Sequence, residues 1–170
     1  HGIEVILENP NVGEHVQDHA IVTQSFEVND GVPSGDVLRD PNVLDAVMKL
    51  YASSQAGPLG QSTLSSAYIP LADDKGILPV AERQRLFDEH APTAKDAPGW
   101  AEEFAVIRSL VEPLDEPTVQ YIMFPGQLTI EPRPADINSV FRPSTPGNYV
   151  SVATALNHPF SRGAVHITSG

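Results

Sequence analysis

The chain has 170 residues, a formal net charge of −12, 16 prolines and no cysteine. The lack of cysteine excludes disulfides, zinc–thiolate sites and thiol catalysis, and the negative charge argues against nucleic acid or an anionic membrane surface as a partner. No apolar run approaches the roughly 20 residues of a membrane-spanning helix. These features indicate a loop-rich globular protein that is long enough to bury one core.

The first third of the chain predicts two strands and a helix. Residues 3–7 are expected to form a short strand, and residues 10–19 a polar loop. Residues 20–28 alternate between apolar and polar side chains, which is typical of a strand. A helix is predicted to begin at Pro41, with Asp40 as its cap. Its apolar residues recur at helical spacing: Val43, Leu44, Val47, Met48 and Tyr51.

The rest of the chain predicts two more helices and three strands, separated by a proline-rich excursion over residues 125–148. The helices cover residues 80–90 and 99–111, and the strands residues 119–124, 149–156 and 164–168. The last two strands flank a short loop and are expected to form an antiparallel pair. Strands in pairs with helices grouped between them predict an α+β fold, with a mostly antiparallel sheet and helices on one face.

Two short motifs near the ends of the chain resemble one enzyme family. Residues 10–19 read PNVGEHVQDH and resemble the PGVGENLQDHP segment of glucose-methanol-choline (GMC) flavin oxidoreductases, where the chain leaves the FAD domain for the substrate domain. Residues 158–167 read HPFSRGAVHI and resemble that family's P-x-S-R-G-x-V-x-I motif. Both motifs occur in the family's order. The turn Gly57-Pro58-Leu59 resembles a further turn of its substrate domain.

This resemblance implies that the chain is an interior fragment of an FAD-dependent enzyme. Residues 1–19 would be the strand and loop that leave the missing FAD domain, and residues 20–170 the substrate-binding domain. The chain has no G-x-G-x-x-G turn for the pyrophosphate and no C-terminal segment with the family's catalytic histidine. We therefore expect no catalytic residue in this chain. The parent protein would oxidise an alcohol by hydride transfer to FAD, with the FAD domain as the fragment's partner, and the fragment would be inactive alone.

The resemblance also points to residues of the substrate pocket. It implies that His19 lies at or near the pocket. In members that oxidise choline, the second residue after this histidine is a carboxylate; here that position is Ile21, which predicts a neutral alcohol. Tyr121 and Met123 would form a pocket wall if their strand faces the flavin, and plain core residues otherwise. The alternative for His19 is an architectural role, in which Asp18 caps a turn and His19 satisfies buried backbone groups.

The second motif is expected to be structural. The resemblance implies that Arg162 holds neighbouring carbonyl groups or a carboxylate. A nucleophilic Ser161 with His158 or His166 as its base is the alternative, although the strand–turn–helix setting of such a serine is absent from the pattern.

Two other function classes fit parts of the sequence. His15 and His19 have the H-x-x-x-H spacing that places two imidazoles on one face of a helix, which suggests a small metallohydrolase. Pro10 and Gly13 argue against a helix there, and no third ligand suggests itself. The other class is a free-standing acidic α+β binding module that needs no cofactor and presents its acidic helices to a basic partner.

Overall fold

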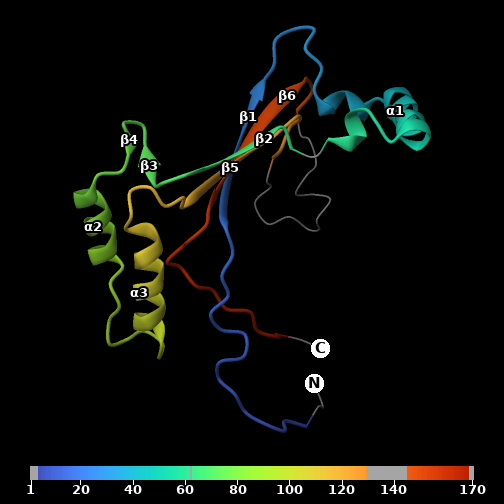
Figure 1. Cartoon of the computed structure of the whole chain (residues 1–170). Coiled ribbons are helices and arrows are strands. Elements are labelled where there is room, and N and C mark those ends of the chain that lie inside the picture. The colour runs from blue at the N-terminus through green and yellow to red at the C-terminus, as the bar shows by residue number, and fades with distance from the viewer. Residues whose placement is uncertain (1–3, 62, 130–144, 169–170) are drawn as a thin grey trace. The chain divides into compact units, whose positions relative to one another are not determined.

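The computed structural model describes residues 4–61, 63–129 and 145–168 (Figure 1). The chain divides into two compact units. Unit 1 consists of His1–Ala20, Pro70–Thr118 and Leu156–Gly170, and unit 2 of Ile21–Ile69 and Val119–Ala155. The two units are sets of residues that lie close to one another in space. The boundary predicted after residue 19 is of another kind, because it separates the end of an FAD domain from a substrate domain. That boundary stays a prediction.

Unit 2 is built on a four-stranded sheet. Its strands, in spatial order, are β1 (Ala20–Glu27), β6 (Tyr149–Leu156), β5 (Val119–Phe124) and β2 (Ser65–Ile69). Strands β2 and β5 are antiparallel, with Ala67 opposite Tyr121. Strands β1 and β6 also run in opposite directions, since Val28 donates to Asn148 while the Ser25 hydroxyl meets that of Ser151. The predicted α+β class with a mostly antiparallel sheet is confirmed, although β2 was not predicted.

One helix of unit 2 follows its predicted signals closely. Helix α1 (Pro41–Ser54) lies between the 3-10 turns Gly35–Arg39 and Pro58–Gly60. As predicted, the Asp40 carboxylate caps it by accepting the N–H of Asn42 at 2.8 Å. The helix ends at Ser54, where Gln55 adopts a left-handed φ of 52°. None of its residues is buried, and Leu44, Met48 and Tyr51 of its apolar stripe are exposed.

Unit 1 contains the other two described helices, α2 (Val80–Glu89) and α3 (Trp100–Val111). Both lie within one residue of their predicted bounds. A short hairpin of β3 (Ala72–Asp73) and β4 (Gly76–Ile77) precedes α2. The core of this unit consists of Phe87, Phe104, Ile107 and Val111, with Trp100 and Phe160 packed against them. Burying these apolar side chains stabilises the unit.

Two predicted strands are wrong. Residues 164–168 form no strand and do not pair with β6; instead they lie against the loop that holds the first motif. The described part of the predicted N-terminal strand, residues 4–7, is also not a strand. Most of the predicted excursion, residues 130–144, lies outside the described residues. None of the described helices is long and apolar enough to cross a membrane.

Candidate functional site

The two motifs, at opposite ends of the chain, are joined by backbone hydrogen bonds within unit 1. Val16 and Gly163 form an antiparallel bridge, with N···O distances of 3.0 and 2.7 Å. The N–H of Val165 also donates to the carbonyl of Gly13 at 2.7 Å. Gly13 has a φ of +86°, a left-handed conformation that favours glycine. The two motifs, residues 10–19 and 158–167, therefore lie against each other in the structure. We call the site that they form the motif junction.

Arg162 anchors the motif junction to α3. Its guanidinium donates to the carbonyls of Pro159 and Ser161, each at 2.9 Å, and to the Glu103 carboxylate, with Nε at 3.0 Å. The same group lies 5.3 Å from the ring centroid of Trp100. The predicted role of Arg162 in holding carbonyls or a carboxylate is therefore confirmed. Nε and Nη2 both donate to Oε1 of Glu103, and such charge-assisted hydrogen bonds are stronger than neutral ones.

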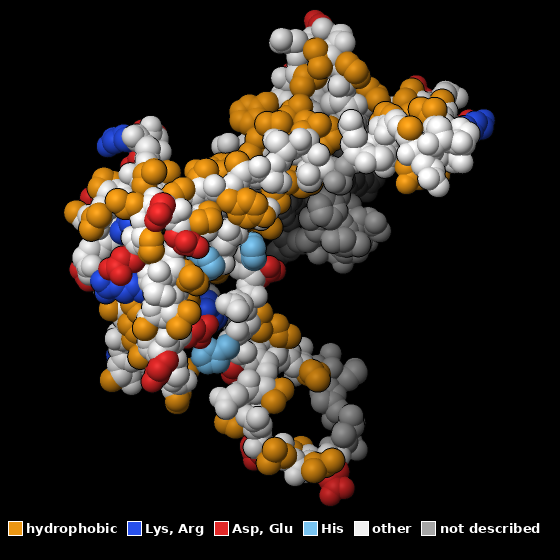
Figure 2. All heavy atoms as spheres, in the orientation of Figure 1, with side chains coloured by type: hydrophobic (Ala, Val, Ile, Leu, Met, Phe, Trp, Pro, Cys, Tyr) orange, Lys and Arg blue, Asp and Glu red, His pale blue; other side chains and the backbone are white. Residues whose placement is uncertain are grey.

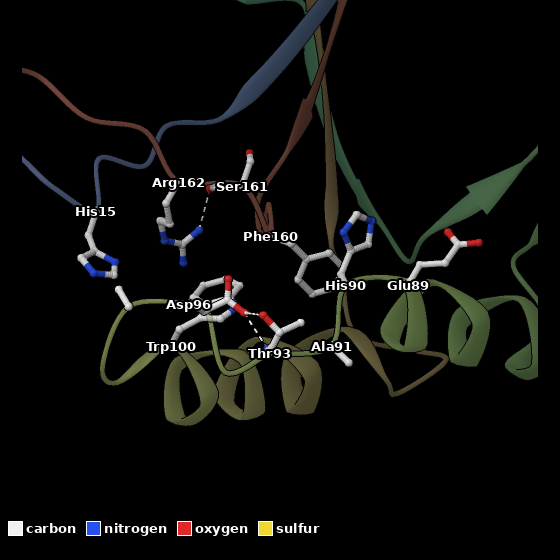
Figure 3. Close-up of a pocket in the computed structure, with 11 residues that line it drawn as sticks. His15, Glu89, His90, Ala91, Thr93, Asp96, Trp100, Phe160, Ser161 and Arg162 are labelled. Carbon is white, nitrogen blue, oxygen red and sulfur yellow. Dashed lines mark hydrogen bonds between the residues drawn. The ribbon is translucent and has the colours of Figure 1, made fainter.

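An open hollow of about 480 Å³ lies beside Arg162 (Figure 3). The side chains of His15, His90, Trp100, Phe160 and Arg162 line it together with residues of the loop between α2 and α3. The ring of His90 stacks on Phe160, with centroids 5.2 Å apart and an angle of 27° between the planes. On the α2–α3 loop, Asp96 accepts hydrogen bonds from the N–H and the hydroxyl of Thr93. These hydrogen bonds lower the pKa of the exposed Asp96, which remains ionised at neutral pH.

His19 lines a neighbouring hollow of about 380 Å³. Gln17, Asp18 and His19 come from the first motif, and Asn157, His158 and Pro159 from the start of the second. The Asp18 carboxylate accepts the N–H of the next residue, His19, at 2.7 Å. His19 is exposed, which leaves its imidazole accessible to a ligand. The structure thus brings His19 and His158 to one surface, a pairing that the sequence did not indicate.

The other predicted pocket residues belong to unit 2. Ile21 lies on β1 with 49% of its surface exposed. Tyr121 and Met123 are half-buried on β5, two residues apart and therefore on one face of the sheet. The structure brings Tyr121 and Met123 together and places His19 in the other unit. A pocket wall formed by all four residues stays a prediction.

The local structure contradicts the metallohydrolase geometry. Residues 10–19 form turns and no helix, and His15 has a φ of 57°, so His15 and His19 do not share a helical face. In the described part of the chain no three His, Cys, Asp or Glu side chains converge as metal ligands. The Ser161 alternative also finds no support, because His166 pairs with Glu14 at 2.8 Å and neither His158 nor His166 is hydrogen-bonded to Ser161 among the described contacts.

The residues of this chain do not fit the pyrophosphate of FAD. Such a group is held by a Gly-rich turn at a helix N-terminus, where N–H groups and the helix dipole favour negative charge. The N-termini of the described helices instead carry acidic side chains: Asp40 caps α1, Glu82 lies in the first turn of α2, and Glu102 and Glu103 in that of α3. These carboxylates repel an anion, so the N-termini of the described helices provide no place for the cofactor's phosphates.

Sequence reasoning did not identify several lining residues as site residues, Phe160 and His15 among them. Phe160 packs against the core cluster, and its ring stacks on His90. In the sequence, Phe160 was noted only as a member of the second motif. His15 had been noted only as a metal ligand, whereas its Nδ1 lies 3.9 Å from Glu103. Both residues belong to the site because they contact α2 or α3. These contacts join residues that are far apart in the sequence, so the spacing of nearby residues does not reveal them.

Comparison with known proteins gives a consistent set of relatives. No protein-family model matches the chain. The chain is 25% identical over 175 residues to the dehydrogenase citC of Monascus ruber, covering 98% of the chain and 28% of that protein. It is 28% identical over 170 residues to the alcohol oxidase of Pichia angusta, covering 99% of the chain and 21% of that protein. The chain thus spans about a quarter of the length of these relatives.

A solved structure shows the same fold. The crystal structure of a formate oxidase matches 99% of the chain and 26% of its own length, with a TM-score of 0.58 and 22% identity. The relatives in sequence and in structure are oxidoreductases of the type that the two motifs resemble, and each match runs across nearly the whole chain. These matches support the resemblance of the two motifs to GMC oxidoreductases, and the chain is similar along nearly its whole length to a fragment of such enzymes.

Proposed function

We propose that the parent protein is an FAD-dependent enzyme that oxidises a neutral alcohol, and that this segment forms one side of its substrate pocket. The motif junction carries the proposal. It joins the residues that resemble the entrance to the substrate domain with those of the second motif, and it leaves His19 accessible beside His158. The alcohol oxidases that match the segment along its full length support the same reaction class.

The flavin and the catalytic base belong to other parts of the parent. When bound there, FAD would take up the hydride from the alcohol carbon. This segment's contribution is to orient the alcohol and to exclude water from it. No Gly-rich turn in the sequence would hold the pyrophosphate, and the net charge of −12 adds repulsion. We therefore expect the isolated segment to bind no flavin and to show no activity.

The exposed apolar surface of unit 2 supports the proposal that a partner domain covers it in the parent protein. Helix α1 has no buried residue, and the edge strand β1 exposes Ile21, Val22 and Phe26. Figure 2 shows hydrophobic side chains gathered over the sheet and α1. Complete monomers rarely leave large contiguous apolar patches uncovered. The FAD domain of the same parent is the proposed occupant, because the segment spans only about a quarter of its relatives. A free-standing binding module would instead have a closed surface.

The choice of a neutral alcohol rests on Ile21. A quaternary ammonium group needs a carboxylate or an aromatic cage. Ile21 offers neither, since its side chain is aliphatic and uncharged. An uncharged alcohol with an apolar substituent is the substrate class that suits this surface.

The test begins with the coding sequence that flanks the segment, followed by expression of the complete protein. We expect flavin absorbance bands in the purified protein and bleaching of these bands by a neutral primary alcohol under anaerobic conditions. Choline serves as the matched cationic alcohol and is expected to bleach the flavin far more slowly. A complete protein without bound flavin, or one reduced equally fast by choline, would contradict the proposal.

A further inference from the structure

A small apolar cavity in unit 1 reaches from the core of the unit to its surface. Its volume is about 210 Å³, and its apolar lining residues are Leu71, Leu86, Phe87, Val111, Leu156 and Phe160. Phe87 and Val111 are buried, whereas Leu71, Leu86 and Leu156 are half-buried. The cavity therefore has a closed end against the core and an open end at the surface. The proposed function assigns no role to it.

The polar atoms of the buried lining residues do not face this cavity. Arg83 is 2% exposed, and its guanidinium donates to the carbonyls of Leu78 and Val111, each at 3.0 Å. Its Nη2 and the hydroxyl of Thr118 are fully buried, so neither presents a polar atom to the empty space. The other polar lining residues are His90 and His158, and no lining residue, all in the described part of the chain, is acidic. Such walls favour an uncharged, apolar ligand.

The side chain of His158 lines both this cavity and the hollow that contains His19. Consecutive residues of the chain separate the two spaces, since Leu156 lines the cavity and Asn157 lines the hollow. The N–H of Asn157 donates to the carbonyl of Thr118 at 2.9 Å, which holds this segment beside the cavity. All of these residues belong to unit 1. The two spaces therefore adjoin at His158.

We propose that the apolar cavity binds the substituent of the alcohol substrate, with the hydroxyl group beside His19 and His158. This inference rests on the proposed function and adds a limit on the size of the substituent. A cavity of roughly 150 Å³ holds benzene, so a volume of about 210 Å³ suits a single carbon ring or a short branched chain. A charged substituent would lose its hydration against these walls without gaining a partner.

Two leucines at the open end determine the substrate specificity in this proposal. Leu86 lies on α2 and Leu156 at the end of β6, and both are half-buried lining residues. Their side chains narrow the space through which a substituent enters. Adding or removing a few carbon atoms at such a position changes the discrimination between apolar substrates by about tenfold or more.

The test measures anaerobic reduction of the flavin in the complete parent protein with three primary alcohols. Ethanol has no substituent that fills the cavity, cyclohexylmethanol carries a single ring, and 1-adamantanemethanol carries a cage that is too large. We expect the second-order rate constant for cyclohexylmethanol to exceed that for ethanol at least about tenfold, since burial of the ring stabilises the bound alcohol. It should exceed that for 1-adamantanemethanol by a similar factor.

Two substitutions of Leu86 should shift this preference in opposite directions. Leu86→Phe narrows the cavity, and the ratio of the rate constants for cyclohexylmethanol and ethanol should fall about tenfold. Leu86→Ala widens it, and the ratio for 1-adamantanemethanol and cyclohexylmethanol should rise about tenfold. The matched control is Val106→Phe, because Val106 is 59% exposed on α3 and does not line the cavity. Both ratios should stay unchanged in the control.

A second measurement does not depend on the reaction and remains decisive if the Leu86 variants fail to fold. A crystal structure of the complete protein with bromobenzene should show the bromine inside the cavity. Unchanged ratios in both Leu86 variants would overturn the inference and leave the proposed function intact. The same holds for a crystal in which bromobenzene is absent from the cavity or a side chain of the parent fills it. If no alcohol reduces the flavin, the proposed function fails, and this inference fails with it.

Discussion

Gly13 and Val165 approach so closely that a methyl group added at Gly13 would lie 2.2 Å from the carbonyl oxygen of Val165. No Cβ atom tolerates such a distance from a backbone atom. The two residues belong to the two family motifs, and the N–H of Val165 donates to the carbonyl of Gly13. The glycine is therefore required by the contact between the motifs as well as by its own turn.

Gly13→Ala is expected to break the motif junction. The matched control is Gly31→Ala, because Gly31 has a similar φ of +80° but nothing within 4 Å of the added methyl group. The control should lose about 1 kcal/mol through backbone strain alone, and Gly13→Ala about 1–3 kcal/mol more through the steric conflict. In the complete protein, hydrogen–deuterium exchange of residues 158–168 should accelerate in Gly13→Ala only. Equal exchange in both variants would show that the contact does not matter.

Arg162→Met is expected to destabilise the junction through the loss of its carbonyl and carboxylate partners. The side chain is 12% exposed, so its hydrogen bonds are poorly replaced by water, and we expect a loss of about 1–3 kcal/mol in the free energy of unfolding. Arg85→Met serves as the control, since its exposed ion pairs should contribute less than about 1 kcal/mol.

The Arg162 effect is measured by thermal unfolding of the complete protein. Glu103→Gln and the double variant complete a cycle that isolates the coupling between the two side chains. If the Arg162 and Glu103 substitutions prove additive, the coupling is absent and the anchoring role of Arg162 is wrong.

Elements with strong local signals were predictable from the sequence. Helix α1 has a capping aspartate followed by proline; it begins at the predicted Pro41 but ends at Ser54, before the predicted stop at Gly57-Pro58. Helix α3 has apolar residues at helical spacing and lies within a residue of its predicted bounds. Strand β2 was missed because Ser65, Ser66 and Ala67 carry no strand pattern of their own. They are extended because they pair with β5, and that pairing is a long-range contact.

The same reasoning explains the wrong strand and the incomplete site. Residues 164–168 have the composition of a strand, but their backbone partner is the Gly13 loop, which no local pattern identifies. His90 became part of the site through the stack on Phe160. The motif resemblance supplied His19 and Arg162, whereas the cavity around Arg83 depends on contacts between α2 and the end of α3 that only the structure shows.

Asp36 is expected to make unit 2 sensitive to acid. Burial by itself raises the pKa of this carboxyl, but hydrogen bonds from the backbone N–H of Gln127, from Arg39, from the N–H of Tyr149 and from Ser34 outweigh burial and hold the pKa below 3.8. A depressed pKa in the folded state contributes stability above the unfolded pKa, and this contribution is lost as the pH falls through the folded value. Stability should therefore decline as the pH is lowered from about 5 through 3.8 and below.

The acid sensitivity is tested by urea unfolding of the complete protein at several pH values. Asp36→Asn should cost about 1–3 kcal/mol at neutral pH, since an amide oxygen replaces a charged acceptor, and it should flatten the decline between pH 5 and 3. Asp45→Asn is the control, because Asp45 is exposed and pairs with the exposed Lys49, and it should leave the curve unchanged. A decline of the same steepness in Asp36→Asn would assign the effect to other carboxylates.

Ile21→Glu should change the charge preference of the parent enzyme. In the proposed function Ile21 occupies the position at which choline-oxidising relatives carry a carboxylate, so a glutamate there would attract a cationic alcohol. We expect kcat/KM for choline, relative to a neutral alcohol of similar size, to rise about tenfold. Val22→Glu provides the control, since Val22 is also exposed on β1 but points to the opposite face of the sheet. If both variants shift the ratio equally, the added charge acts at a distance, and Ile21 does not line the pocket.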